Sequence, residues 1–355
     1  MDIDDAGPMA GAIPWPHCEV EFHGVGGMIS VVIPYFQRER GILGKALQSV
    51  FASQGVDRLE VIVVDDASPV PAREELAAIG PTRFPVTVIE QTNSGPGGAR
   101  NTGLDKVSPD TEYVAFLDSD DEWSPQHLQN ALTALRAGYD VYFADHLQLG
   151  AETSAFQRAN RIIPADHALI AGHSDLHAYG DEMFDQIILA NVIGTSTVVY
   201  DYRKHSDIRF RNNLKMAGED YLFWLDLSLR STRFAFGDTT EVVYGKGVNV
   251  FAGSGWGSEN HAHRIVDELS FRRCLLKEYY LNEAQRLSVT HGIQNLRNGL
   301  VRDFVHRLRH RKQINWELLA VAMHKEPAIL LRVFPVIVQV LIDSSQQRTK
   351  LKNRQ

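Results

Sequence analysis

Short and almost wholly apolar runs, each of which stops abruptly at acidic or turn-forming residues, constrain the fold of this chain more than any other feature. Such runs are too short for a helix of ordinary length and predict strands buried on both faces. Segments with helical spacing, at residues 41–54 and 72–79, lie between them. Strands that alternate with helices predict an α/β fold, with a mainly parallel central sheet flanked by helices. The expected strands are residues 28–33, 59–64, 86–90 and 113–117.

Composition and charge exclude several classes of protein. The 355 residues are 44% hydrophobic and 23% charged, which is ordinary for a well-cored globular chain. The net charge of −8 argues against a nucleic-acid partner. The charge is unevenly distributed, because residues 295–355 carry 12 Lys and Arg against 4 Asp and Glu, a net +8, and the rest of the chain therefore carries −16. Cys18 and Cys274 fit neither a zinc site nor a disulfide framework. No secretory signal opens the sequence, so we expect a cytoplasmic protein.

The acidic stretch at residues 118–121 (Asp-Ser-Asp-Asp) directly follows the strand expected at 113–117. In open sheets of this kind, ligands bind outside the carboxyl ends of the strands. Asp118 and Asp120 could therefore converge on a hard divalent cation, which prefers oxygen ligands and often keeps phosphate oxygens in its shell. The alternative is a solvated acidic turn or a helix cap. The apolar strand before this stretch, and a second acidic pair at another strand end, favour a functional site.

That second pair, Asp65 and Asp66, ends the strand at 59–64. Carboxylates can accept hydrogen bonds from a nucleobase or a ribose, but a strand-ending Asx turn accounts for the pair equally well. The glycine-rich residues 94–98 precede Arg100, which could meet a phosphate or a carboxylate at a helix start. Their spacing matches neither the dinucleotide nor the P-loop fingerprint, so the glycines alone favour a flexible loop.

Asp220 follows Glu219 at the start of an amphipathic helix expected to run through Leu229. Carboxylates are favoured at helix N-termini, so capping is the leading interpretation from the sequence alone. A carboxylate at this place could also act as a general base if it faced the metal site.

In this order and combination, five segments resemble the successive motifs of family 2 glycosyltransferases. The resemblance covers about residues 28–235, and residues 34–43 and 245–256 are similar to bacterial exopolysaccharide glucosyltransferases of the succinoglycan type. It implies the GT-A fold and an inverting transfer from a nucleotide-diphosphate sugar. The five segments are residues 31–35 (Val-Val-Ile-Pro-Tyr), 63–68 (Val-Val-Asp-Asp-Ala-Ser), 97–103 (Gly-Gly-Ala-Arg-Asn-Thr-Gly), 116–121 (Phe-Leu-Asp-Ser-Asp-Asp) and 218–221 (Gly-Glu-Asp-Tyr).

The same resemblance implies a role for each matching position. Asp118 and Asp120 match the metal-binding Asp-x-Asp of the family, which takes Mg²⁺ or Mn²⁺, and Asp220 matches the catalytic base. Ala67 stands where the family usually has Gly, and Trp123 and Trp224 are candidates for the acceptor site. The remaining positions would hold the donor nucleotide, its base, ribose or phosphates: Pro34, Tyr35, Asp65, Asp66 (the chief member of the acidic pair), Arg100, Asp118 and Ser119.

The predicted function is transfer of glucose from a UDP-sugar to a hydroxyl of a saccharide acceptor, lipid-linked, in exopolysaccharide biosynthesis. A nucleotidylyltransferase would want a Gly-rich loop bearing Arg and Lys directly after the first strand, where residues 34–38 read Pro-Tyr-Phe-Gln-Arg. A non-catalytic module that binds nucleotide sugars would not need Asp220. These two alternatives stay open at the level of sequence.

The chain divides into a flexible arm (1–27), a catalytic GT-A domain (28–250) and a helical C-terminal region with a basic tail (251–355). The apolar residues 328–342 are shorter than the ~20 residues needed to span a bilayer, and Arg332 and Pro335 interrupt them. With the basic residues at 301–312, they could lie on the anionic inner face of the cell membrane. Packing against the catalytic domain or a second subunit is the equal alternative.

Overall fold

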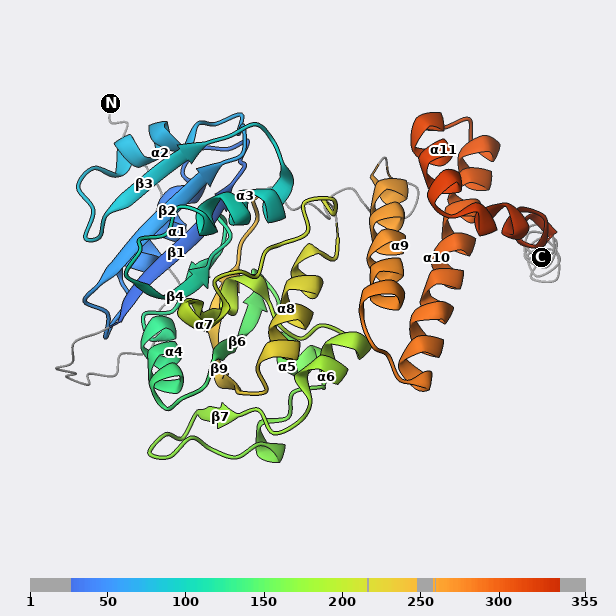
Figure 1. Ribbon diagram of the computed structural model, residues 1–355. Helices are drawn as coiled ribbons and strands as arrows, with labels where there is room; N and C mark the ends of the chain where they lie inside the picture. Colours follow the sequence, from blue (N-terminus) through green and yellow to red (C-terminus); the bar gives the residue numbers. More distant parts are fainter. Residues whose placement is uncertain (1–26, 216, 248–257, 259, 339–355) are drawn as a thin grey trace, which may run out of the picture.

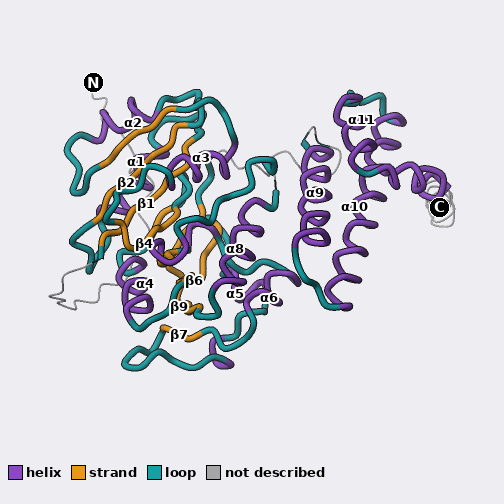
Figure 2. Tube along the Cα trace, viewed as in Figure 1, coloured by secondary structure: helices purple, strands orange, loops and turns teal. Residues whose placement is uncertain are grey.

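The computed structural model describes residues 27–215, 217–247, 258 and 260–338. A nine-stranded sheet lies between helices, and a group of long helices extends from one side of it (Figures 1 and 2). The predicted N-terminal arm and Cys18 lie outside the described residues, apart from Gly27. Cys274 is a half-buried free thiol.

The first half of the sheet is parallel, as the sequence predicts, with strand order β3-β2-β1-β4. Successive residues of β1 point to opposite faces: Ile29, Val31 and Ile33 enter one apolar core, and Val32 enters the other. Both faces are therefore covered, which explains the unbroken apolar runs. The elements are β1 (Met28–Tyr35), α1 (Ile42–Phe51), β2 (Leu59–Asp65), α2 (Ala72–Ile79), β3 (Val86–Glu90), α3 (Gly95–Leu104) and β4 (Thr111–Phe116).

The second half of the sheet is mixed. Beyond β4 the order continues β8-β6-β9-β5, with antiparallel pairs everywhere except between β6 and β9, and β7 pairs with β9. The four longest pairings of the sheet (β1 with β2 and β4, β2 with β3, β6 with β9) are parallel, and the antiparallel pairs of the second half are short, which agrees with the predicted α/β fold. The elements are β5 (Glu122–Trp123), α4 (His127–Arg136), β6 (Val141–Gln148), β7 (Leu176–Ala178), β8 (Val199–Asp201), α8 (Glu219–Arg230) and β9 (Phe234–Tyr244).

Between β6 and α8 the chain forms short helices that no sequence pattern predicts. Helices of three to seven residues show too little periodicity to be recognised. They are α5 (Ala155–Ala159), η1 (Pro164–Asp166), α6 (Met183–Leu189), η2 (Thr195–Thr197) and α7 (Tyr202–His205).

All elements that the structure describes after β9 are helical: α9 (His261–Glu278), α10 (Glu283–Arg309), α11 (Trp316–Lys325), η3 (Pro327–Ile329) and the helical residues 330–338. Helix α9 packs on α8, and a Cβ placed on Gly218 would lie 2.8 Å from the Phe271 side chain. Among the described residues, no helix is long and apolar enough to cross a membrane. The apolar stretch at 328–342 is described only as far as residue 338.

Candidate active site

Four chain segments meet around the carboxyl ends of β2, β4 and β9. They are the acidic pair after β2, the acidic stretch after β4, the glycine-containing turn after β9 and the N-terminal end of α8. Helix α3 contributes Arg100, which touches two of these segments. The parallel half of the sheet brings the first two segments to one edge, in line with the sequence prediction.

Asp65 is committed to the backbone. Its Oδ1 accepts the N–H of Ser68 (2.7 Å) and its Oδ2 accepts the N–H of Ala72 (2.8 Å), the first residue of α2. Both oxygens therefore stabilise the turn and the start of the helix, as the Asx-turn interpretation predicts.

Asp66 is equally occupied. Its Oδ1 accepts hydrogen bonds from Gln91 Nε2 and from the N–H of Ser94, each 2.7 Å long, and its Oδ2 accepts the N–H of Gly95 (2.9 Å). Asp66 thus fixes the glycine-rich turn that begins α3. Ala67 between these features has φ 59°, in the left-handed region, which costs a residue with a Cβ roughly 1–2 kcal/mol. That cost is the physical reason why glycine suits this position.

Pro34 is half-buried at the end of β1, and Tyr35 is fully buried. Burial raises the pKa of the Tyr35 phenol to about 12, with a further contribution from Glu75. The Tyr35 carbonyl accepts the N–H of Asp66 (2.9 Å). Tyr35 therefore supports the acidic pair from within the core, and its contact with a nucleotide stays a prediction.

The acidic stretch after β4 is more open. The Asp118 side chain is 36% exposed, and its Oδ1 accepts a hydrogen bond from Arg100 Nη2 (2.6 Å). Asp120 accepts the N–H of Gly247 through Oδ2 (2.8 Å), and burial, with repulsion from Asp118, raises its pKa. Ser119 is buried, with its hydroxyl accepting from Gln37 Nε2 (3.0 Å), and so turns away from the opening.

This donor set fits a hard divalent cation. Arg100 engages one oxygen of Asp118 and the N–H of Gly247 engages one oxygen of Asp120, and among the described residues no hydrogen bond is observed at the second oxygen of either carboxylate. Burial is the main cause of the raised pKa of Asp120 and repulsion from Asp118 adds to it, and a bound cation would offset both. Within the described residues, no group of three or more Asp, Glu, His or Cys could hold a metal. A cation here would accordingly complete its shell with phosphate and water oxygens.

Arg100 links this site to α8. Its side chain is buried, and its Nη1 lies 3.5 Å from Oε1 of Glu219 while Nη2 binds Asp118. The guanidinium also lies 5.3 Å from the centroid of the Phe210 ring. Burial works to lower the pKa of Arg100, but the carboxylates of Asp118 and Glu219 outweigh it and the pKa is raised. One permanent charge thus serves two carboxylates.

Asp220 lies close to the same charges. Burial raises the pKa of its carboxyl, Arg100 opposes the rise, and Asp118 adds to it. Gly218, with φ 92°, occupies the N-cap of α8 without a side-chain cap, and Asp220 in the first turn accepts the N–H of the adjacent Tyr221 through Oδ1. Asp220 therefore lies at a helix N-terminus, as the capping interpretation expects, and also beside the charges of the candidate site. Its role as a base stays a prediction.

Sequence reasoning missed Glu219 as a site residue. Burial raises the pKa of its carboxyl to about 7, with repulsion from Asp220 as the next cause. A Cβ on Gly97 would lie 3.1 Å from the Glu219 side chain, so the glycine-rich start of α3 makes room for it. Its position beside Asp220 in a helix start was the only signal, and that position is typical of capping residues.

The sequence also did not predict that Ser196 and the turn after β9 contact the acidic stretch. Asp121 accepts hydrogen bonds from the Ser196 hydroxyl and from the N–H of Gly245. Burial, Asp118 and Asp120 raise its pKa well above the usual value. A Cβ on Gly245 would lie 1.7 Å from the carbonyl oxygen of Asp120, so the chain after β9 passes directly against the acidic stretch.

The two tryptophans predicted as acceptor candidates are core residues. Trp123 is 1% exposed and donates its indole N–H to the Ser196 carbonyl (2.6 Å), and Trp224 is fully buried among aromatic rings of the sheet core. Neither side chain faces an opening. An aromatic residue near an acidic motif was too weak a signal, because large aromatic residues usually serve the core.

Comparison with known proteins places the chain in a family. Residues 30–192 match the model of glycosyl transferase family 2. The chain is 41% identical over 227 residues to the succinoglycan biosynthesis protein ExoW of Rhizobium meliloti (strain 1021), covering 63% of this chain and 70% of that protein. The chain belongs to glycosyl transferase family 2. It is a transferase, as the motifs predicted.

Solved structures support the GT-A fold of this family 2 member. The mannosyltransferase PcManGT from Pyrobaculum calidifontis, in complex with GDP-Man and Mn²⁺, superposes with a TM-score of 0.53 at 15% identity, covering 90% of this chain and 88% of that one. S. aureus TarS 1-349, in complex with UDP-GlcNAc, gives a TM-score of 0.51 at 19% identity, covering 87% and 80%. At these identities the likeness shows the fold alone.

Proposed function

We propose that this family 2 enzyme is an inverting glycosyltransferase of exopolysaccharide biosynthesis. It transfers glucose from a UDP-sugar to a hydroxyl of a lipid-linked saccharide. The catalytic unit comprises residues 28–250, followed by the helical region 251–355. The observation that carries the proposal is the buried Arg100, which joins the predicted metal-binding carboxylate Asp118 to the start of α8. The identity with ExoW supports the class of pathway.

At the donor end, Asp118 and Asp120 would hold Mg²⁺ or Mn²⁺ together with the diphosphate. The cation supplies neutralisation of the charge that develops on the leaving nucleoside diphosphate. Asp66 holds the glycine-rich turn in place, which keeps the start of α3 and Arg100 oriented toward the donor. The bound GDP-Man and Mn²⁺ of PcManGT and the UDP-GlcNAc of TarS belong to proteins of the same fold, which supports this assignment.

At the acceptor end, Asp220 is the proposed base. Its carboxylate takes the proton of the acceptor hydroxyl while that oxygen bonds to the anomeric carbon. The bond from the anomeric carbon to the diphosphate breaks on the opposite face, and configuration is inverted. Burial raises the pKa of Asp220, and a carboxylate of higher pKa is the stronger base. A non-catalytic module would have no use for such a group.

The test is a screen of nucleotide sugars for donor hydrolysis, with and without chelator, combined with thermal unfolding. We expect one UDP-sugar to be hydrolysed slowly only when a divalent cation is present, and to raise the melting temperature. Asp118→Asn should lose both effects. Asp207→Asn is the matched control, because that carboxylate is exposed and, among the described residues, forms its ion pair with Arg230. Hydrolysis that persists in excess chelator contradicts the proposal.

We further propose that the enzyme works in the cytoplasm at the inner face of the cell membrane. Exposed apolar side chains support this: Leu330 is 57% exposed, and Leu331 and Phe334 are each 76% exposed beside Arg332. Basic residues near an anionic surface contribute about 1 kcal/mol each. Flotation with anionic vesicles should fail for Phe334→Ser, whereas Leu229→Ser, an exposed control on α8, should still float. If the protein floats equally well with neutral and anionic vesicles, or floats with neither, the result favours packing of these apolar residues in a protein interface.

A further inference from the structure

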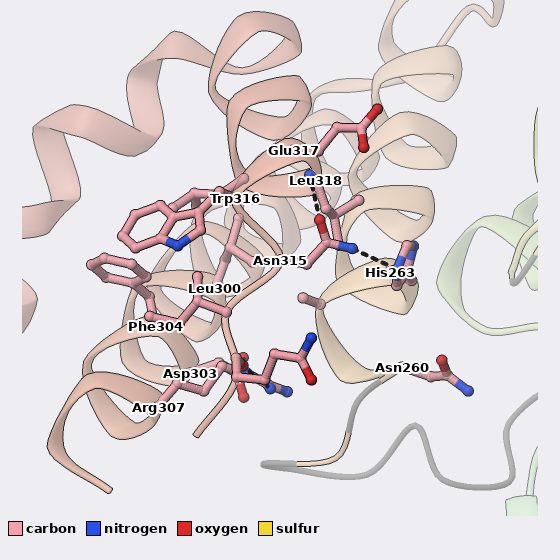
Figure 3. Close-up of a pocket in the computed structure, with 14 residues that line it drawn as sticks. Asn260, His263, Leu300, Asp303, Phe304, Arg307, Asn315, Trp316, Glu317 and Leu318 are labelled. Carbon is pink, nitrogen blue, oxygen red and sulfur yellow. Dashed lines mark hydrogen bonds and ion pairs between the residues drawn. The ribbon is translucent and has the colours of Figure 1, made fainter. Parts of the chain in front are cut away.

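A pocket of about 510 Å³ lies between α9, α10 and the start of α11, apart from the acidic site (Figure 3). Its volume is within the range of small-molecule sites. Its lining comes from the first turn of α9, the last turns of α10 and the segment that joins α10 to α11. None of the catalytic residues proposed above belongs to it. The pocket therefore needs an explanation of its own.

A buried ion pair forms one part of the lining. Asp303 is 2% exposed, and its Oδ2 accepts from Arg307 Nε (2.6 Å). Arg307 also donates to the carbonyls of Gln313 (2.9 Å) and Ser258. The other carboxylate oxygen, Oδ1 of Asp303, has no hydrogen-bond partner in the described part of the chain. An unmet buried acceptor costs about 1–3 kcal/mol, so a donor is missing here. Because Arg307 already supplies the positive charge, a neutral hydroxyl suffices.

The other walls differ in character, as Figure 3 shows. Trp316, 62% exposed, meets Phe304 edge to face, with ring centroids 5.7 Å apart. Across the pocket, Asn315 Nδ2 lies 3.5 Å from Nε2 of the exposed His263. Aromatic rings on one side, amide and imidazole groups across from them, and the Asp303 carboxylate on α10 suit a ligand with an apolar face and a rim of hydroxyls. A sugar ring has this chemistry.

We propose that this pocket is a second saccharide-binding site, which holds a more distant part of the acceptor glycan. The inference rests on the proposed function, because it assigns the second site to the acceptor of that reaction. Chain connectivity supports it: Ser258, which binds Arg307, lies eleven residues after Gly247, which binds Asp120. An extended segment of this length spans at most about 40 Å, which sets an upper limit on the distance that one glycan would have to bridge.

Binding is tested directly with cello-, laminari- and malto-oligosaccharides graded by length. Saturation-transfer NMR should detect contact between the oligosaccharides and the wild-type enzyme. Trp316→Ala should bind them at least tenfold more weakly, a loss of about 1.4 kcal/mol of binding free energy, and Trp316→Phe should recover part of the affinity. Leu308→Ala is the matched control, because Leu308 is 52% exposed on α10 and does not line the pocket. The wild-type affinity should rise with oligosaccharide length.

Kinetics give the second readout. Trp316→Ala should raise the KM for long acceptors about tenfold, with kcat and the KM for short acceptors unchanged. Absence of saccharide contact in the wild type, or equal binding by wild type and Trp316→Ala, overturns the second site. Failure of the proposed function is separate, because it would appear as absence of donor hydrolysis in the wild type while the NMR contacts persist.

Discussion

Aspartates follow both β2 and β4 at the same edge of the parallel half-sheet, but the hydrogen bonds that they accept differ. After β2, Asp65 and Asp66 each accept hydrogen bonds at both carboxylate oxygens, mainly from backbone N–H groups. After β4, Asp118 and Asp120 each use one oxygen in this way, beside further carboxylates.

This contrast separates scaffolding from chemistry. A carboxylate saturated by N–H donors is stable where it lies and has little left to offer a ligand. A carboxylate such as Asp120, held beside Asp118 with its pKa raised by burial and repulsion, is stabilised when a cation or a proton arrives. The acidic pair should therefore control stability, and the acidic stretch with α8 should control turnover. Four experiments test this division.

Removal of divalent cations has the largest expected effect. Transfer should fall to background in excess chelator, because the diphosphate then leaves without several kcal/mol of charge stabilisation. Addition of Mg²⁺ or Mn²⁺ should restore it, and Asp120→Asn should raise the cation concentration needed for half-maximal activity. The measurement is initial rate against free cation concentration. Unchanged activity in chelator would show that the acidic stretch is scaffolding as well.

Asp220→Asn should lower kcat about 10²–10⁴-fold, because the amide cannot accept the acceptor proton. Its size is nearly that of the carboxylate, so donor affinity and melting temperature should change little. The matched control is Asp207→Asn, whose exposed side chain lies outside the site. A folded Asp220→Asn enzyme with near-normal turnover would refute the assignment of the base.

Asp65→Ala should destabilise the fold by about 1–3 kcal/mol, because the N–H groups of Ser68 and Ala72 lose their buried acceptor. Chemical denaturation measures the free energy of unfolding. Asp207→Asn should stay within about 0.5 kcal/mol of the wild type. If Asp65→Ala kept full stability but lost donor binding, Asp65 would be a ligand-binding residue and the contrast between the two strand ends would fail.

The smallest effect concerns pH. Burial raises the pKa of Glu219 to about 7, above its value of 4.5 in an unfolded chain, so the folded state binds more protons between these pH values. The contribution of Glu219 to the free energy of unfolding should therefore be fully present below pH ~4.5 and should be lost as the pH rises toward ~7. Glu219→Gln should make that fall shallower, whereas Glu74→Gln, an exposed control, should not. Parallel curves would exclude Glu219 as the source.

The sequence allowed the parallel half of the fold to be predicted, because strands buried on both faces appear as unbroken apolar runs. The mixed half was not predictable in this way. β9 changes from Phe234–Phe236 to a polar stretch, and its pairing with β6 shifts register, so neither an apolar run nor a clean alternation marks it. Short strands such as β7 give no periodic signal at all.

For the site, the family motifs identified which acidic residues matter but not how they are bonded. The hydrogen bonds of Asp66 to Ser94 and Gly95 join segments 28 and 29 residues apart, and no local pattern encodes such pairs. The same holds for Arg100, whose two carboxylate partners come from the acidic stretch after β4 and from α8. Asp220 was placed correctly near these charges only through the resemblance, because a helix start alone favours capping.

The passage of residues 245–247 against the acidic stretch has a consequence for mutational tolerance. A side chain at Gly245 would collide with the carbonyl of Asp120, and one at Gly247 would lie 2.5 Å from the Asp120 Cβ. Lys246 between them is exposed. In a saturation library selected for activity, every replacement at positions 245 and 247 should therefore be depleted, while position 246 should accept many. This glycine–any–glycine pattern would reveal the contact with the acidic stretch, although the two segments lie more than a hundred residues apart along the chain.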